Sequence, residues 1–282
     1  MSSATVSELA NMITVHTDLD EVEIAGEVYT GVLKRPKKEL SQWLYCVLHA
    51  GNSHLLDDNN GQDLTEKINN CIDDSTLKVP AAYEIVRGEK YAVTNGVRVY
   101  APIVNGEIEL PSKRPNLTPG FFMFVSMNEL GKYRHYVGAA NPEEAINFWA
   151  EGIKRLQGKG YKFSAKVLSN TGSYPRNDAI VFYSNSDKEN VEKELILLAE
   201  ELVIDSSKLT GSPFMDALVN SLGYGEQPLD SNGIHESLGE QRTKLLALAI
   251  RDVFTTGLDL KVLITQRFKK ANINLDNVAL NA

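Results

Sequence analysis

The pattern of hydrophobic and polar positions changes character several times along the chain. The first 80 residues are predicted to be mostly helical. Within them, KKELSQWLYCVLHAGN carries apolar residues at helical spacing from Leu40 to Leu48, and Gly51 ends the pattern. Residues 52–80 follow as a polar stretch, whose Asn, Asp and Gly content predicts a loop with one short helix. This stretch is the best candidate for a linker or a mobile segment.

From Tyr83 the pattern becomes that of β-strands. Residues 83–110 contain two Asn-Gly pairs between β-branched and aromatic residues, which is the signal of β-hairpins. Further strands are predicted over residues 121–127, 134–140 and 161–169, and over the segment that ends in AIVFY at Tyr183.

Helices alternate with these strands and follow them. They are predicted over residues 141–160, 187–203, 236–254 and 259–273, with a Gly-, Pro- and Asn-rich loop at about 210–233. Asn141 is placed to cap the first of them, and Pro142 suits its first position. Clustered strands with helices between and after them predict an α+β fold, with a mainly antiparallel sheet and flanking helices. We expect a helical N-terminal region with a mobile polar segment (1–80) and an α+β domain (81–282).

Composition narrows the class of protein. The 282 residues are 43% hydrophobic and 23% charged, as in ordinary globular proteins. The formal net charge of −8 argues against a broad nucleic-acid-binding surface, but leaves room for a local basic pocket that binds a single phosphate. Neither a secretory signal nor an apolar run of roughly 20 residues is visible, so we expect no membrane partner and a cytoplasmic location. Cys46 lies in an apolar run and is expected to be a buried structural thiol.

Candidate chemistry is concentrated in the stretch YKFSAKVLSNTGSYPRNDAIVFY, residues 161–183. Alternate residues of a strand face opposite sides, so Phe163 lies on an apolar face and Lys166 lies on the other. That second face is either simply solvated or part of a site. The following loop favours a site, because it returns Arg176 and Asp178 to the end of the same sheet, near Tyr183. Asp178 is placed to orient Arg176 and to leave the rest of its planar guanidinium for a phosphate.

Two other places add candidates. Arg134 and His135 are consecutive in a predicted strand, and His135 is the most interesting of the five histidines because its neighbours are basic. A lone histidine is usually structural, and the other four lack metal-ligand spacing. Arg242 lies in the first turns of a helix that Ser237 is placed to cap. It is either part of an exposed helix face or a further cation for an anion pocket.

Several familiar chemistries have no counterpart in the sequence. It contains no phosphate-binding P-loop, no nucleophile elbow, no HExxH pair and no kinase signature. Nothing requires zinc, a nucleotide or a flavin, and we expect no cofactor. A site made of Lys, His and Arg suits proton abstraction that expels an anionic leaving group.

Three segments carry a family resemblance: LSQWLYCVLHAGN, FSAKVLSNTGSYPRNDAIVFY and HESLGEQRTKLLALAI, in this order. They resemble the HopA-type effector family of bacterial proteins over residues 37–255. The run from Tyr174 to Ala179 is the most specific piece. The family includes type III secreted effectors of plant pathogens, and homologues encoded in lanthipeptide and thioamide-peptide clusters beside a separate kinase.

The resemblance implies a fold similar to that of the phosphothreonine lyases, which eliminate phosphate and leave a dehydroamino acid. It implies Lys166 as the general base and His135 as the general acid. Arg176, Arg242 and Arg134 would bind the phosphate, with Asp178, Tyr183 and Tyr174 in support. The sequence departs from the lyases in lacking their lysine–any–histidine arrangement. Because Arg134 and His135 are adjacent, they point to opposite faces, and only one of them faces the site unless the register shifts.

Two classes of function follow from the resemblance. The first is a lyase that acts on phosphoserine or phosphothreonine of a precursor peptide, phosphorylated by a partner kinase, during maturation of a ribosomal peptide natural product. The alternative is a protein of the same fold without catalysis, either a module that binds a peptide or a kinase, or a type III effector.

Overall fold

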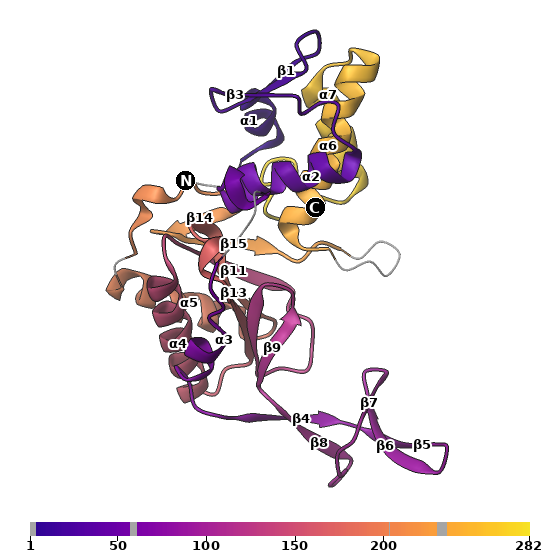
Figure 1. The fold of residues 1–282 in the computed structure, drawn as a ribbon, viewed down its shortest axis with the longest axis vertical. Coiled ribbons are helices and arrows are strands. Elements are labelled where there is room, and N and C mark those ends of the chain that lie inside the picture. The colour runs from indigo at the N-terminus through magenta and orange to yellow at the C-terminus, as the bar shows by residue number, and fades with distance from the viewer. Residues whose placement is uncertain (1–3, 57–60, 203, 230–235) are drawn as a thin grey trace.

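The structure is a computed structural model that describes residues 4–56, 61–202, 204–229 and 236–282. Its elements form three parts along the long axis of the molecule (Figure 1). The two terminal regions lie together at one end, a large sheet lies in the middle, and an arm of short strands extends at the other end. The polar segment 52–80 and the loop 210–233 each include residues outside the described ranges, where His235 also lies.

The central sheet has seven strands in the order β14-β15-β11-β13-β12-β10-β9, and every neighbouring pair is antiparallel. The strands are β9 (Lys113–Thr118), β10 (Phe121–Val125), β11 (Tyr133–Ala139), β12 (Phe163–Leu168), β13 (Arg176–Ser184), β14 (Asp216–Val219) and β15 (Leu222–Glu226). The predicted α+β class with a mainly antiparallel sheet is therefore confirmed.

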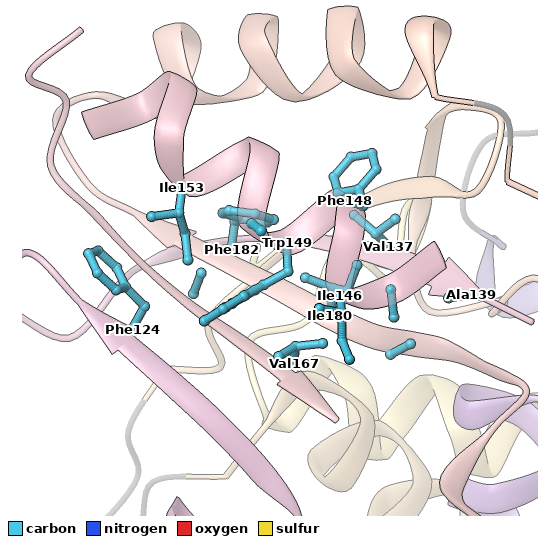
Figure 2. Packing of buried hydrophobic residues seen from close by; sticks show 14 of the residues in the cluster. Phe124, Val137, Ala139, Ile146, Phe148, Trp149, Ile153, Val167, Ile180 and Phe182 are labelled. Atoms are coloured by element: carbon cyan, nitrogen blue, oxygen red, sulfur yellow. The ribbon is translucent and has the colours of Figure 1, made fainter. Parts of the chain in front are cut away.

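Two helices, α4 (Pro142–Gly158) and α5 (Lys188–Glu201), cover one face of this sheet. Trp149 of α4 is fully buried between the helix and the sheet (Figure 2). It packs edge-on against Phe122, with 5.7 Å between the ring centroids. Three alternate residues of β12 are fully buried in the same core: Phe163, Ala165 and Val167. The predicted apolar face of this strand is therefore the face that packs under the helices.

Both terminal regions cover the other face. They comprise α1 (Val6–Asn11), β1 (Ile13–His16), β2 (Glu21–Ile24), β3 (Glu27–Thr30), α2 (Lys37–Leu44), the π-helical segment η1 (Tyr45–Ala50), α6 (Leu238–Thr256) and α7 (Leu260–Lys270). One hydrophobic core joins Trp43 of α2 to Ile250 of α6 and Phe268 of α7, and it reaches Tyr136 and Val181 of the sheet.

The prediction of a mostly helical N-terminal region needs correction, because β1, β2 and β3 form an antiparallel sheet there. The sequence EVEIAGEVYT alternates with period two around a turn in which Ala25 and Gly26 both have positive φ, and this is the signal that the helical interpretation missed. The boundary near residue 80 stays a prediction, although residues before it share a core with α6 and α7. The remaining short helical elements are η2 (Ser53–Leu56), α3 (Thr65–Asn69), η3 (Thr171–Ser173) and η4 (Ser206–Lys208).

The arm consists of two small antiparallel sheets. They contain β4 (Thr76–Pro80) with β8 (Glu107–Pro111), and β5 (Ala82–Val86) with β6 (Glu89–Thr94) and β7 (Val97–Val99). Both Asn-Gly pairs, at Asn95 and at Asn105, have positive φ at both residues, as the turns of tight hairpins require. The hairpins predicted for this stretch are therefore confirmed.

The segment predicted as a loop at 210–233 contains the hairpin β14–β15, which forms one edge of the central sheet. Glycines in β15 suggested a loop, but they serve close packing instead. A Cβ at Gly225 would lie 2.6 Å from Leu238 Cδ2, and one at Gly223 would lie 3.1 Å from Met215 Cβ. Glycine in a strand often marks such a close approach.

Candidate anion-binding site

Lys166 and Arg176 both lie close to the ring of Phe121. Lys166 Nζ lies 4.0 Å from the ring centroid, and Arg176 Cζ lies 5.6 Å from the same centroid. Lys166 comes from β12 and points away from α4 and α5, because its neighbours Ala165 and Val167 are buried under those helices. The sheet therefore brings the two cations that the sequence singled out to the same aromatic ring.

Asp178 holds Arg176 in a fixed orientation, as predicted. Arg176 Nε donates to Asp178 Oδ1 at 2.6 Å, and Arg176 Nη2 donates to Asp178 Oδ2 at 3.0 Å. Burial by itself would raise the pKa of the Asp178 carboxyl. The charge and hydrogen bonds of Arg176 outweigh burial, and they hold this pKa well below its usual range. Asp178 is therefore a carboxylate at neutral pH.

Two residues of η1 complete this cluster, and neither was among the predicted site residues. The Tyr45 hydroxyl donates to Asp178 Oδ2 at 2.6 Å and accepts from Arg176 Nη2 at 3.1 Å. His49 Nε2 lies 3.8 Å from Asp178 Oδ2, and His49 Nδ1 lies 3.1 Å from Ser212 Oγ. The spacing of Tyr45 and His49 by about one helical turn in an apolar run is the sequence signal that could have identified them.

His49 is neutral in this environment. Its side chain is 1% exposed, and its pKa is lowered to about 4, chiefly because burial disfavours the imidazolium. The carboxylate of Asp178 opposes this shift. Three cations act in the same direction as burial: Arg176, Arg134 and Lys166.

Gly239 of α6 allows His49 to lie against the helix, since an added Cβ would lie 2.3 Å from His49 Cδ2. We expect Gly239→Ala to lower the free energy of unfolding by about 1–2 kcal/mol in urea denaturation, because the imidazole must move out of a packed core. The matched control is Gly158→Ala in α4, where an added Cβ meets nothing within 4 Å. Equal free energies of unfolding for the two variants would contradict this expectation, because η1 would then move away from α6 without loss of stability.

Arg134, not His135, lies on the Lys166 side of the sheet. Arg134 pairs with Tyr183 across β11 and β13, and its Cζ lies 5.2 Å from the Tyr183 ring centroid. Arg134 is 6% exposed, and its Nη2 donates to Gln227 Oε1. Of the two adjacent residues that the sequence left as alternatives, Arg134 is therefore the one on the face of the candidate site.

His135 lies under α5 on the opposite face, and its predicted pairing with Lys166 needs correction. His135 pairs with Phe182, which belongs to the core beneath the helices, and His135 Nε2 lies 3.1 Å from Glu192 Oε2 of α5. Burial lowers the pKa of His135 against the opposing effect of Glu192. The whole sheet separates His135 from Lys166, so the two side chains cannot act on one substrate atom.

The predicted role of Arg242 as a phosphate ligand also needs correction. It is fully buried, with Nε donating to the Val278 carbonyl at 3.0 Å and Nη2 donating to the Leu280 carbonyl at 3.3 Å. Its guanidinium thus fastens the C-terminal segment to α6 and is not presented to an anion.

Tyr174 also has a structural role, because its hydroxyl donates to the Leu168 carbonyl at 3.1 Å and connects the loop before β13 to the end of β12.

A cavity of about 700 Å³ lies beside two residues that contact His49. Asn177 and Ser212 line it, and the same two residues hold His49 in place. Asn177 Nδ2 donates to the His49 carbonyl at 3.2 Å, and Ser212 contacts the imidazole. The cavity and the cation cluster therefore share one wall.

The described residues contain neither a cluster of metal ligands nor a membrane-spanning helix. No group of three or more His, Cys, Asp or Glu side chains is arranged to hold a metal ion in this part of the chain. In the same ranges, no helix combines the length and the apolar character needed to cross a membrane.

The buried histidine predicts how stability depends on pH. The unfolded His49 titrates near pH 6.5, whereas the folded one titrates near pH 4, so the unfolded state binds more protons between these values. Stability is therefore full above pH 6.5 and falls as the pH drops toward 4. We expect His49 to contribute a loss of about 2 kcal/mol between pH 7 and pH 5, measured by urea denaturation.

A His49→Gln variant provides the comparison, because it lacks the His49 imidazole and should lose about 2 kcal/mol less than the wild type between the two pH values. His135, whose pKa burial also lowers, contributes equally to the loss in both proteins. Replacing His16, which is 38% exposed, should leave the loss unchanged. Equal losses in the wild type and in His49→Gln would contradict the assignment of the loss to His49.

The chain is similar to a known protein family in sequence and to two solved structures in fold. The model of the HopA1 effector protein family matches residues 112–280. An effector protein from Pseudomonas syringae pv. syringae strain 61 has a similar structure, with a TM-score of 0.42 and 19% identity over 57% of this chain and 63% of that one. For an effector protein from Pseudomonas syringae pv. tomato strain DC3000 the values are 0.43 and 20%, over 57% and 62%. The match thus spans less than two thirds of either effector, and no curated protein matches the chain.

Proposed function

This chain belongs to the HopA1 effector protein family, and we propose that it is a cofactor-free lyase that removes phosphate from phosphoserine or phosphothreonine in a peptide. The proposed substrate is a precursor peptide of a ribosomal natural product, phosphorylated by a partner kinase. In this proposal Lys166 is the base, and Arg176 and Arg134 bind the phosphate.

One observation carries the proposal: a cluster of cations on one face of the sheet in an otherwise acidic protein. Arg176 and Arg134 contribute two positive charges, and Asp178 contributes one negative charge, so the cluster keeps one positive charge in excess when the Lys166 amine acts as a neutral base. The formal net charge of the chain is −8. A local positive field of this kind attracts and orients a dianionic phosphate group.

The proposed reaction is a β-elimination. The neutral Lys166 amine takes the proton from Cα of the phosphorylated residue. The electron pair of that C–H bond forms the Cα=Cβ double bond, and the Cβ–O bond breaks with its electrons leaving on phosphate. The arginines stabilise the charge that builds on the departing phosphate. Because His135 lies on the other face, the leaving group departs onto the arginines without protonation by that histidine.

A binding module for phosphopeptides or for a kinase is the second candidate. It is favoured by the neutralisation of Arg176, which commits Nε and Nη2 to Asp178 before any ligand arrives. A module of this kind needs a cation for recognition, but it does not need Lys166 as a base.

Mass spectrometry of phosphothreonine and phosphoserine peptides incubated with the protein distinguishes a lyase from a binding module. The peptide made by an associated kinase is the preferred substrate where such a kinase is found. Loss of phosphoric acid, with a thiol adduct on the new alkene, supports the lyase. Recovery of intact phosphopeptide at high enzyme concentration, with the kinase present, rejects elimination and favours the binding module. The unphosphorylated peptide is the control for non-specific thiol addition.

A further inference from the structure

The anion site has a wall that comes from the N-terminal region. We propose that Tyr45 of η1 is a positioning residue that sets the orientation and the available charge of Arg176 for binding a phosphorylated peptide. The inference rests on the anion site of the proposed function, but not on the elimination step. It assigns a role in ligand recognition to a segment that precedes the family match over residues 112–280.

One hydroxyl connects both members of the central ion pair. Tyr45 donates its only hydroxyl proton to Asp178 Oδ2 at 2.6 Å, and its oxygen accepts from Arg176 Nη2 at 3.1 Å. Arg176 Cζ also lies 5.6 Å from the Tyr45 ring centroid. Tyr45 therefore contacts the guanidinium through both its ring and its hydroxyl.

These contacts leave one end of the guanidinium for a ligand. Nε and Nη2 have acceptors in Asp178 and Tyr45, whereas Nη1 has no hydrogen-bond partner among the residues that the structure describes. The Arg176 side chain is 13% exposed, which allows an anion to approach. The network therefore leaves Nη1 available for a ligand while it fixes the rest of the arginine.

The Tyr45 proton also changes how strongly Asp178 neutralises Arg176. A carboxylate that accepts an additional hydrogen bond has less negative charge available for its other partners. If the hydroxyl is removed, Asp178 interacts more strongly with the guanidinium, and less positive field remains for a phosphate. Both effects, on orientation and on charge, predict weaker anion binding without Tyr45.

η1 is held firmly enough for this role. The rings of Tyr45 and His49 lie 5.1 Å apart, and His49 packs edge-on against Tyr136 of the sheet at 5.5 Å. Gly51 ends the segment in a left-handed conformation, at a point where an added Cβ would clash with Asn177. The segment is therefore fixed at both ends against the strands that carry the site.

The test is binding of a peptide that cannot react. In this peptide a phosphonate replaces phosphothreonine, with a CH₂ group in place of the bridging oxygen, so that phosphate cannot leave. Calorimetry compares the wild type with Tyr45→Phe, and the same peptide with unmodified threonine serves as the second ligand. We expect the dissociation constant for the phosphonate peptide to rise about tenfold in Tyr45→Phe, with no change for the threonine peptide.

Tyr29→Phe is the matched control, because Tyr29 also donates its hydroxyl to a carboxylate, that of Glu27 at 2.6 Å, in the same N-terminal region. It should bind the phosphonate peptide like the wild type. In an Arg176→Lys background, Tyr45→Phe should have almost no effect, since the group that it positions is gone. Circular dichroism of each variant reports whether the fold is retained.

Unchanged phosphonate affinity in folded Tyr45→Phe would overturn the inference and leave the lyase proposal intact. An equal tenfold loss in the Arg176→Lys background would also overturn it, because Tyr45 would then act independently of Arg176. Failure of the wild type to prefer the phosphonate peptide would reject the anion site and the inference together. Preference for the phosphonate, with the expected effect of Tyr45→Phe but no elimination of true phosphopeptides, would support the inference and reject the lyase.

Discussion

Lys166→Met should lower kcat/KM for phosphate elimination from a phosphothreonine peptide by about a thousandfold. General bases contribute roughly 10²–10⁴ to rates, and no other amine contacts the ring of Phe121 in the described part of the chain. Methionine retains the apolar stem that packs on this ring, so the loss should appear in kcat and not in the fold. Phosphate release under single-turnover conditions provides the measurement.

Lys162→Met is the matched control, because Lys162 precedes the same strand and is exposed. It should retain the elimination rate of the wild type. A Lys166→Met rate within tenfold of the wild type would exclude Lys166 as the base, and the cation cluster would then be better explained as a binding site.

Arg242→Met should lower the free energy of unfolding by about 2–4 kcal/mol, the second large effect that we expect. The substitution leaves the Val278 and Leu280 carbonyls without their donor in the interior, and each buried acceptor left unpaired costs about 1–3 kcal/mol. Burial lowers the pKa of Arg242 to about 10, so at neutral pH the wild type retains a charged donor at this position. Urea denaturation measures the loss.

Arg251→Met, an exposed position on the same helix, should change stability by less than about 0.5 kcal/mol. Affinity of folded Arg242→Met for the phosphonate peptide should equal that of the wild type. If that affinity fell tenfold while stability was retained, Arg242 would be a phosphate ligand, as the family resemblance implied, and its structural role would be wrong.

Most of the features that the sequence predicted correctly, such as helix caps and the faces of strands, depend on residues that are close together in the chain. Asn141 caps α4 by accepting from the Glu144 amide at 3.0 Å, and Ser237 caps α6 in the same way. The alternation in β12 correctly assigned Lys166 to the face opposite the core, because side chains alternate whatever the strand pairs with.

The predictions were wrong where the position of a side chain depends on residues that are far away in the sequence. Adjacency showed that Arg134 and His135 point to opposite faces, but only the pairing of His135 with Phe182 determines which face each one takes. His49 was dismissed because its spacing to other histidines suggested no metal, whereas its role depends on Asp178, far along the chain. Arg242 was read as a surface cation because nothing local indicates the C-terminal carbonyls that it binds.

The arm enters and leaves the body of the protein at a single point, since Thr76 at its start pairs directly with Pro111 at its end. The family match begins one residue beyond, at Ser112. A segment whose two ends are neighbours can be exchanged for a short turn or for an unrelated module without moving the strands on either side. Evolution can therefore lengthen, shorten or replace residues 76–111 independently of the central sheet, so relatives with the same sheet can carry quite different appendages here.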